Sequence, residues 1–523
     1  MKELPIAIET FSTIINNNYV YVDKTKYIYE MIKPGKKYFL SRPRRFGKSL
    51  LVSTIEEVYK GNKELFKDLY IYEKWDWNKN NPVIKLNFGK TEYSSPENLT
   101  NSLDDFINRT AKNFSIRLYS TTLSGKFSEL IEETYKKFDK RVVILVDEYD
   151  KAIIKNMSNP EVLKANKRIL QNFYGVLKSV DEHLEFLFVT GVSKFTGTSL
   201  FSDFNSPDDI TLDYKYSSIC GYTQEDLERE FKEQITETSK TLDCSEETLL
   251  SWIKKWYNGY SWDGKVKVYN PFSILNFFSK ERFDNYWYRT GTPSFLKDKI
   301  VAKNNIKPVL EEISVFSNIL DSSDPLNVGE IPLLFQTGYL TIKSAEIKRG
   351  RDYFTLGIPN MEVKESLFEN LLKEYTDKTL QEIQGLKLEI TEQLKNNDSE
   401  GLRESINIML ANIPHDIHGK DEAYYHSVFL VWLQTMGFNI EAIIVTNKGE
   451  IDSVIKIGNE TLVIEIKYSK TEKEEQLKKA INKAFTQIYE KEYFQKYLRR
   501  KHLKLLGIAF HRKNVLCEFR FLD

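Results

Sequence analysis

The sequence has little cysteine, no long apolar segment and no excess of charge of either sign. Its three cysteines are far apart and odd in number, which argues against a disulfide scaffold or a cysteine-based metal site and fits a reducing compartment. No run of about eighteen apolar residues occurs, and the N-terminus lacks the apolar stretch of a signal peptide. We therefore expect a soluble, cytoplasmic protein without a membrane partner. The abundance of Lys, Ile and Asn suggests a microbial source.

The charges balance, because Lys plus Arg and Asp plus Glu each number 75 in 523 residues. Global charge therefore neither indicates nor excludes a nucleic-acid partner, and any basic surface must be local. Hydrophobic residues make up 41% and aromatic residues 13% of the chain, so several domains can each bury a core. The length predicts about three or four domains.

A nucleotide-binding pattern lies at residues 38–60, YFLSRPRRFGKSLLVSTIEEVYK. A short apolar strand leads into a basic turn, and Gly-Lys-Ser then begins an amphipathic helix. In such a loop the first N–H groups of the helix face an anion, the lysine reaches the terminal phosphates and the hydroxyl binds Mg²⁺. The first glycine of the full motif is missing, since Arg42 stands there, and an ordinary helix start is the alternative. The candidate nucleotide ligands are Arg45, Gly47, Lys48 and Ser49.

Downstream of this loop, apolar strands alternate with helical stretches. Strands are expected at 83–88, 142–146 and 186–189, and helices near 48–60, 97–115, 126–138 and 162–180. This alternation predicts an α/β domain with a mainly parallel sheet covered on both faces. In that architecture ligands bind at the carboxyl ends of the strands.

Polar residues follow two of these strands. We expect Asp147 to belong to the Mg²⁺ shell and Glu148 to polarise the attacking water, as phosphoryl transfer requires. Thr190, at the end of the next strand, would sense the terminal phosphate or align the water. The alternatives are a solvated turn for the two acids, which adjoin Tyr149 and Asp150, and an ordinary strand end for the threonine.

Several motifs together carry a resemblance to a known family. They are SRPRRFGKS, VILVDEYD, FVTGVSKF, WYNGYSWDG, VYNPFSILNFF and YWYRTGTPSFL. They resemble the bacterial family in which an AAA-ATPase-like domain is fused to a PD-(D/E)XK nuclease-superfamily domain, and the resemblance covers nearly the whole chain. It implies ATP as a ligand and makes RPRRFGKS the family's own form of the loop.

The middle of the chain is predicted to be mostly helical. Thr223 and Asp226 have the spacing of a capping box at a helix start. A helix from 331 that breaks at Gly338, a hairpin and another helix resemble a winged-helix module. Its turn carries Lys348, Arg349 and Arg351, which would touch a phosphate backbone, or form a solvated turn.

The expected domains follow from these segments. They are an AAA-ATPase-like P-loop domain (1–215), a helical lid-like region (216–300), a winged-helix-like region (301–376), a helical connector (377–415) and a small α/β, restriction-endonuclease-like PD-(D/E)XK domain (416–523).

The C-terminal segment predicts a metal site on a hairpin. If Gly458-Asn459 is a two-residue loop, Ile457 faces Glu460 and Asp452 faces Glu465. Facing carboxylates are unfavourable, and a divalent cation removes the conflict. Lys467 shares the face of Glu465 and would position water or stabilise the transition state. The spacing resembles the PD-(D/E)XK core; a surface hairpin with a cross-strand salt bridge is the alternative.

Further residues complete this predicted site. Glu422 would supply a third carboxylate, with His426 one helical turn later as the competing candidate. Gln487 resembles the helix-borne glutamine of the superfamily. The flanking basic residues suit a phosphate backbone, or form a solvated helix face; they are Lys470, Lys473, Lys478, Lys479, Lys483, Arg499, Arg500 and Lys501.

The sequence thus predicts an ATP-binding protein, expected to hydrolyse ATP, coupled to a Mg²⁺- or Mn²⁺-dependent nuclease-like domain. The expected substrate is nucleic acid, with DNA favoured. The alternative is a non-catalytic nucleotide switch whose nuclease-like domain only binds nucleic acid or a protein. The sequence is compatible with a homo-oligomer.

Overall fold

A computed structural model describes residues 1–194, 207–287, 312–320, 329–376, 380–411, 422–435, 438–446, 449–457, 460–492, 494–497, 503–511 and 514–521. The chain forms two compact units. The first comprises Met1–Thr290 and Ile313–Glu362, and the second comprises Gly291–Glu312 and Val363–Asp523. The five finer domain boundaries given above stay a prediction.

The first unit is built on a five-stranded sheet in the order β2-β3-β4-β1-β5, in which every pairing is parallel. Its strands are β1 (Lys36–Ser41), β2 (Val83–Asn87), β3 (Val142–Asp147), β4 (Leu184–Gly191) and β5 (Asp208–Asp209). All six residues of β3 are buried, as expected for a central strand covered on both sides. The predicted parallel α/β sheet is confirmed.

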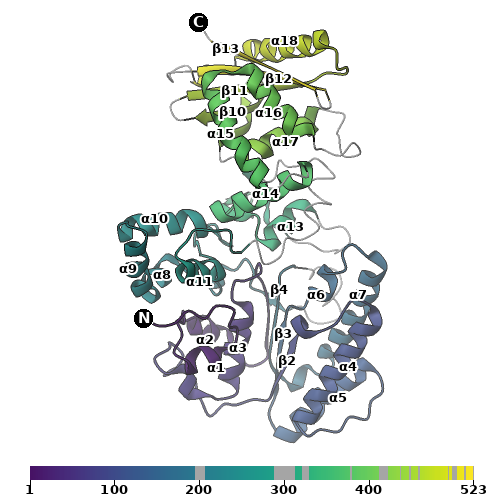
Figure 1. The fold of residues 1–523 in the computed structure, drawn as a ribbon. Helices are drawn as coiled ribbons and strands as arrows, with labels where there is room; N and C mark the ends of the chain where they lie inside the picture. Colours follow the sequence, from purple (N-terminus) through teal and green to yellow (C-terminus); the bar gives the residue numbers. More distant parts are fainter. Residues whose placement is uncertain are drawn as a thin grey trace. The chain divides into compact units, whose positions relative to one another are not determined.

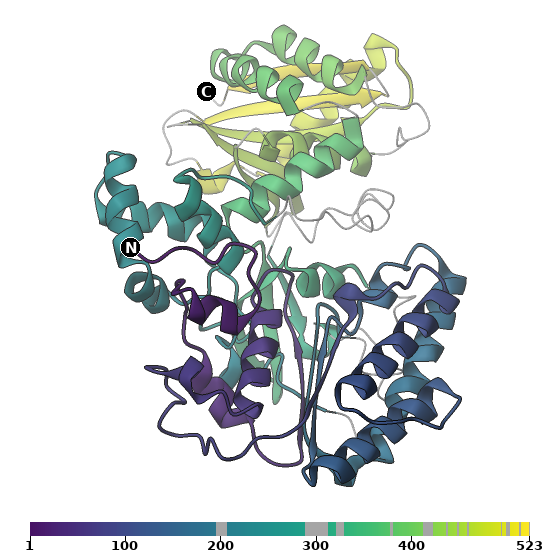
Figure 2. The ribbon, with the colours of Figure 1, turned by 60° about the horizontal axis from the view of Figure 1, so that its bottom comes forward.

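Helices cover both faces of this sheet. They are α1 (Phe11–Asn16), α2 (Thr25–Met31), α3 (Lys48–Tyr59), α4 (Pro96–Asn113), α5 (Leu123–Phe138), α6 (Lys151–Ile154) and α7 (Pro160–Gly175). In two views α1 to α3 lie on one side of the strands and α4, α5 and α7 on the other (Figures 1 and 2). The caps of α4, α5 and α7 explain where they begin, because Ser95, Thr122 and Asn159 each accept a hydrogen bond from a first-turn N–H group.

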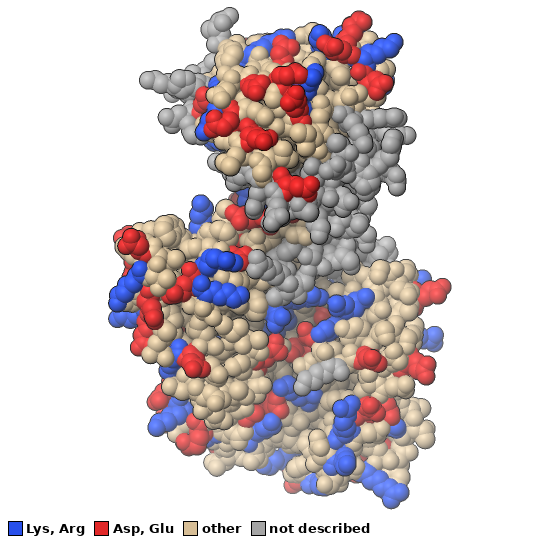
Figure 3. Space-filling model, viewed as in Figure 1, with Lys and Arg blue, Asp and Glu red and all other residues tan. Residues whose placement is uncertain are grey.

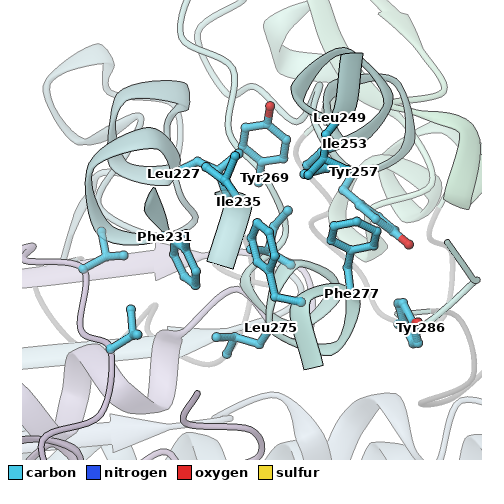
Figure 4. Packing of buried hydrophobic residues seen from close by; sticks show 14 residues of the cluster. Leu227, Phe231, Ile235, Leu249, Ile253, Tyr257, Tyr269, Leu275, Phe277 and Tyr286 are labelled. Atoms are coloured by element: carbon cyan, nitrogen blue, oxygen red, sulfur yellow. The ribbon is translucent and has the colours of Figure 1, made fainter. Parts of the chain in front are cut away.

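A helical subdomain follows the sheet. It contains α8 (Gln224–Glu230), α9 (Lys232–Thr241), α10 (Glu246–Tyr257) and α11 (Pro271–Lys280). The predicted capping box is confirmed, since Thr223 and Asp226 exchange side-chain to backbone hydrogen bonds. Figure 4 shows aromatic and aliphatic side chains from all four helices converging on one core. Val20 and Val22 from the N-terminal segment also belong to this core.

The first unit ends with a small sheet. Strands β6 (Ile313–Phe316), β7 (Thr341–Lys348) and β8 (Arg351–Gly357) pair antiparallel in the order β6-β8-β7. In the chain, α13 (Glu330–Thr337) precedes the β7–β8 hairpin and α14 (Met361–Thr376), most of which belongs to the second unit, follows it. The predicted helix, hairpin and helix are present, and Gly338 ends α13 with φ +93°. Strand β6 was not predicted. The winged-helix assignment itself stays a prediction.

The second unit is a five-stranded sheet with helices. Its helices are α15 (Leu380–Asn396), α16 (Ser399–Ala411), α17 (Glu422–Thr435) and α18 (Glu474–Glu490). Its strands are β9 (Asn439–Thr446), β10 (Gly449–Ile457), β11 (Glu460–Tyr468), β12 (Leu503–His511) and β13 (Asn514–Phe521), in the order β13-β12-β11-β10-β9. Within the described strands of this second sheet, β11 and β12 pair parallel and the other neighbours pair antiparallel. The predicted small α/β domain is confirmed.

Within the described residues, no helix is both long and apolar enough to cross a membrane. Acidic and basic side chains are interspersed over the visible surface of each unit (Figure 3), which agrees with the balanced composition.

Candidate nucleotide and metal sites

The loop between β1 and α3 has the backbone of an anion-binding turn. Gly47 precedes the first residue of α3 with φ +91°, a left-handed conformation that glycine adopts without strain. Arg45 also has a positive φ of 67°, which costs a residue with a side chain about 1–2 kcal/mol. The 12-residue helix α3 then directs its free N–H groups toward this turn.

Lys48 is folded back onto the loop itself. Its Nζ donates to the carbonyl oxygens of Arg42 at 2.8 Å and of Pro43 at 2.9 Å. Burial lowers the pKa of this ammonium group, and Asp147 is the acid that most opposes that effect. The lysine therefore directs two of its three N–H donors to carbonyl oxygens of the loop and has an acidic group nearby.

Arg42, which stands where the full motif has its first glycine, is a buried structural residue. Its guanidinium is fully buried and donates to the carbonyl oxygens of Ser41, Thr211 and Tyr216, while it lies 4.0 Å from the ring centre of Trp262. Burial lowers its pKa to about 10. The side chain joins the end of β1 to segments after β5 and does not line the cavity described below.

The predicted acids lie at the carboxyl edge of the sheet. Asp147 is opposite Asn87 in the strand register and is only 1% exposed. Its Oδ1 accepts a hydrogen bond from Thr190 Oγ1 at 2.9 Å, and its Oδ2 has no hydrogen-bond partner among the described residues. Thr190 and Asp147 are both buried, and neither is among the residues that line the cavity described below. Glu148 is partly exposed and accepts from Lys151 Nζ at 2.6 Å.

The turn after β3 is buried at its centre and partly exposed at Glu148. Tyr149 and Asp150 are both buried, and Asp150 accepts hydrogen bonds from the backbone N–H groups of Val192 at 3.0 Å and Ser193 at 2.6 Å. Burial raises the pKa of this carboxyl to about 6. Asp150 thus fixes the residues that follow β4, a contact that its place in the sequence did not indicate.

A cavity of about 580 Å³ opens beside these groups. Its polar lining residues include Arg45, Lys48, Ser49 and Glu148, together with Gly47. Its apolar lining residues come from three separate segments of the chain. They include Ile8, Val20, Tyr21, Val22, Phe272 and Leu275.

Sequence reasoning anticipated only part of this lining. The predicted ligands Arg45, Gly47, Lys48, Ser49 and Glu148 line the cavity, as do Val20, Tyr21, Val22 and Lys24 from the segment between α1 and α2. Glu9, Tyr222 and Phe272 also line it and were missed. Phe272 stacks under the guanidinium of Arg45 at 5.0 Å. No local pattern could have found these residues, because they are far from the loop in sequence.

The hairpin of the second unit has the predicted register. Ile457 pairs with Glu460, and the pairing continues to Ser453 opposite Ile464. Asp452 is the next residue of β10 and Glu465 the next of β11, so the same register places these two positions opposite each other. The loop residues 458 and 459 and the side chain of Asp452 lie outside what the structure describes.

Glu465 and Lys467 lie together on one face of the sheet. Glu465 is fully buried, and Lys467 Nζ donates to its Oε1 at 3.0 Å and to the carbonyl oxygen of Ile466 at 3.0 Å. Alternation along β11 puts both on the face of Val463, which belongs to the core formed with α18. Gln487 is carried by this same helix.

Helix α17 packs on the opposite face. The ring of Tyr425 stacks on those of Tyr468 and Phe510, with ring centres 5.5 Å and 5.1 Å apart. Tyr468 is three residues after Glu465 in β11, so strand alternation places the two side chains on opposite faces of the sheet. Tyr425 therefore packs on the face opposite Glu465, and the roles of Glu422 and His426 stay predictions. The side chain of Glu422 lies outside the description. Among the described side chains, no three acids, histidines or cysteines form a metal-binding cluster.

The predicted basic surfaces are partly neutralised. On α18, Lys478 pairs with Glu474 at 2.7 Å and Lys479 with Glu475 at 2.8 Å. At the turn between β7 and β8, Lys348 lies 3.3 Å from Glu346. These contacts favour the solvated alternative for these three lysines. Residues 499–501 lie outside the described part.

Comparisons with known proteins divide the chain in the same way. Residues 5–201 match the family described as "Predicted AAA-ATPase", and residues 420–519 match the "PD-(D/E)XK nuclease superfamily". The chain is 35% identical over 518 residues to a protein of Azotobacter chroococcum mcd 1 called "Uncharacterized protein in vnfD 5'region". That similarity covers 98% of this chain and 97% of the relative.

Proposed function

Because this chain belongs to the family that joins a predicted AAA-ATPase domain to a PD-(D/E)XK nuclease-superfamily domain, we propose that it binds and hydrolyses ATP in its first unit and cleaves nucleic acid with a divalent metal in its second. DNA is the favoured substrate. The observation that carries the nucleotide part is the cavity beside Gly47, Lys48 and Ser49.

The cavity supports a nucleotide in size and polarity. Its volume of about 580 Å³ lies within the range of roughly 300–1,000 Å³ that small-molecule sites occupy. The start of α3 would bind the phosphates, and the apolar lining residues would hold the base. Lys48 would leave the two loop carbonyls for the phosphates, because a charge-assisted contact to an anion is stronger than one to a neutral oxygen.

The acids fit a magnesium site beside the phosphates. The buried Oδ2 of Asp147, which lacks a hydrogen-bond partner among the described residues, is an oxygen donor that a cation would satisfy. Ser49 would supply a second oxygen. Glu148 would accept a proton from the attacking water, and Lys151 holds that carboxylate at 2.6 Å in the cavity wall.

The hairpin supports a second metal site. Asp452 and Glu465 would supply oxygen ligands from facing positions, and the full burial of Glu465 makes a bound cation favourable there. Such a metal supplies Lewis acidity and an activated water. Lys467, already 3.0 Å from Glu465, would orient that water or stabilise the charge on the phosphate.

The test is cleavage of labelled DNA and RNA by the purified full chain with Mg²⁺ or Mn²⁺, with and without ATP. We expect metal-dependent cleavage that Asp452→Ala reduces by at least about 100-fold, because removal of a ligand leaves the metal poorly held. Ser453→Ala is the matched control. It removes a buried hydroxyl without a hydrogen-bond partner among the described residues, one position along the same strand.

Two outcomes would contradict this proposal. Cleavage that Asp452→Ala leaves intact would place the nuclease site elsewhere. Metal-dependent binding of DNA without cleavage, together with ATP binding, would favour the alternative of a non-catalytic nucleotide switch.

A further inference from the structure

Aromatic side chains from the middle of the chain pack on the phosphate-binding loop. Phe46 contacts Tyr260 and Trp262 with ring centres 4.8 Å and 5.4 Å apart, and Trp287 lies 5.4 Å from Tyr339. Pro43 is so close to Gly338 that a Cβ there would lie 2.8 Å from the proline side chain. The loop therefore has a packed wall on this side.

Trp287 makes a directional contact within this wall. Its indole Nε1 donates to the carbonyl oxygen of Arg44 at 3.1 Å. In a planar trans peptide the C=O and the following N–H point in opposite directions, so this bond directs the N–H of Arg45 away from Trp287. Arg45 lines the cavity and Trp287 does not. The hydrogen bond thus sets the orientation of one peptide of the anion-binding turn.

The backbone of the same tryptophan is bonded to a buried carboxylate. Trp287 N donates to Glu362 Oε1 at 2.7 Å, and Ser273 Oγ lies 3.0 Å and 2.7 Å from the two oxygens of that carboxylate. Glu362 is fully buried, and burial raises its pKa to about 7. It is the second residue of α14, which runs on across the boundary between the two units.

We propose that Trp287 is a positioning residue for the phosphate-binding loop and that, with Glu362, it couples the conformation of the loop to the first turn of α14. This inference rests on the proposed nucleotide binding. Phosphate would draw Lys48 away from the carbonyls of Arg42 and Pro43 and bind the turn that includes Arg45. The Arg44 carbonyl, the indole and the Glu362 carboxylate form the contiguous path along which that change reaches α14.

Hydrogen exchange and calorimetry with MgATP on the full chain test this path. In the wild type we expect MgATP to slow exchange in the first turn of α14. We expect Trp287→Phe, which keeps a ring but removes the N–H donor, to weaken MgATP binding about fivefold and to abolish the slowing in α14. Tyr260→Phe is the matched control, since it removes a hydroxyl without a hydrogen-bond partner among the described residues from the same cluster.

The outcomes separate this inference from the proposed function. MgATP binding to the wild type with unchanged exchange in α14 would overturn the coupling and leave nucleotide binding standing. Wild-type affinity and slowing in Trp287→Phe would overturn the role of the indole. No MgATP binding to the wild type would remove both proposals. Because the wild-type exchange measurement needs no variant, a variant that fails to fold does not decide the question.

Discussion

At the scale of single residues, buried ionisable groups that bond to the backbone hold the loop between β1 and α3 and the segment that follows β4. Arg42 donates to three carbonyl oxygens, Lys48 to two, and Asp150 accepts from two N–H groups. Burying a charge is costly unless such bonds compensate. The loop geometry is therefore fixed by side chains that reach the backbone of neighbouring segments.

Asp150 should give the protein a pH-dependent stability. Its pKa is raised from 3.8 to about 6 in the folded state, so between those values the folded protein holds a proton that the unfolded chain has lost. The contribution of this group to stability is then greatest below about pH 4 and falls as the pH rises to about 6. The free energy of unfolding should fall by about 2–3 kcal/mol over this pH range through Asp150 alone. The variant Asp150→Asn, whose side chain does not titrate, should lack this fall.

Thermal unfolding of both proteins from pH 4 to pH 7.5 measures this difference. Asp139→Asn is the control, since it removes the same charge from an exposed position at the end of α5. An Asp150→Asn midpoint that follows the wild type at every pH would contradict the prediction.

At the scale of elements, Gly338 lets the end of α13 lie close to Pro43 in the loop between β1 and α3. Gly338 ends α13 with φ +93°, and a Cβ there would lie 2.8 Å from Pro43 and 3.2 Å from Trp287. Gly350, at the tip of the β7–β8 hairpin, has a similar φ of 75°, but a Cβ there would meet no atom of the described residues within 4 Å. The two glycines therefore separate backbone strain from crowding of the loop.

We expect both substitutions to alanine to destabilise the protein by about 1 kcal/mol through the left-handed backbone. Gly338→Ala should cost about 1–3 kcal/mol more from overpacking and should weaken ATP binding, because Pro43 must move. Thermal unfolding and calorimetry with MgATP check both effects. Equal losses of stability and equal affinities in the two variants would argue against this role of Gly338.

At the scale of the whole molecule, the two candidate sites belong to separate compact units. Substitutions in groups that share no partners usually have independent effects. Lys48→Ala should weaken MgATP binding about 10–100-fold, the loss expected for a charged contact, and leave the stabilisation by Mn²⁺ in the second unit unchanged. Asp452→Ala should leave MgATP binding unchanged and should abolish the rise in unfolding temperature that Mn²⁺ causes.

The matched controls for this pair are Lys60→Ala, a surface lysine at the other end of α3 that pairs with Glu56, and Ser453→Ala. Loss of ATP binding in Asp452→Ala, or loss of the Mn²⁺ effect in Lys48→Ala, would show that the two sites are not independent.

Local patterns in the sequence determined the parallel sheet, the start of α3, the capping box at Thr223 and the register of the β10–β11 hairpin. Each of these depends on neighbours in the chain: the alternation of strands and helices, a glycine before a helix, or the period of two along a strand. The placement of Glu465 and Lys467 on one face of the sheet was predictable for the same reason, whereas their hydrogen bond was not predicted.

Only the tertiary structure decided how the loop is supported and what surrounds the cavity. Two of the three carbonyl partners of Arg42, on Thr211 and Tyr216, lie 169 and 174 residues away, and Trp287 contacts Arg44 across 243 residues. Thr190 lies behind Asp147 because adjacent parallel strands place them side by side. These contacts arise when distant segments pack together, and no periodicity or spacing along the chain encodes which segments meet.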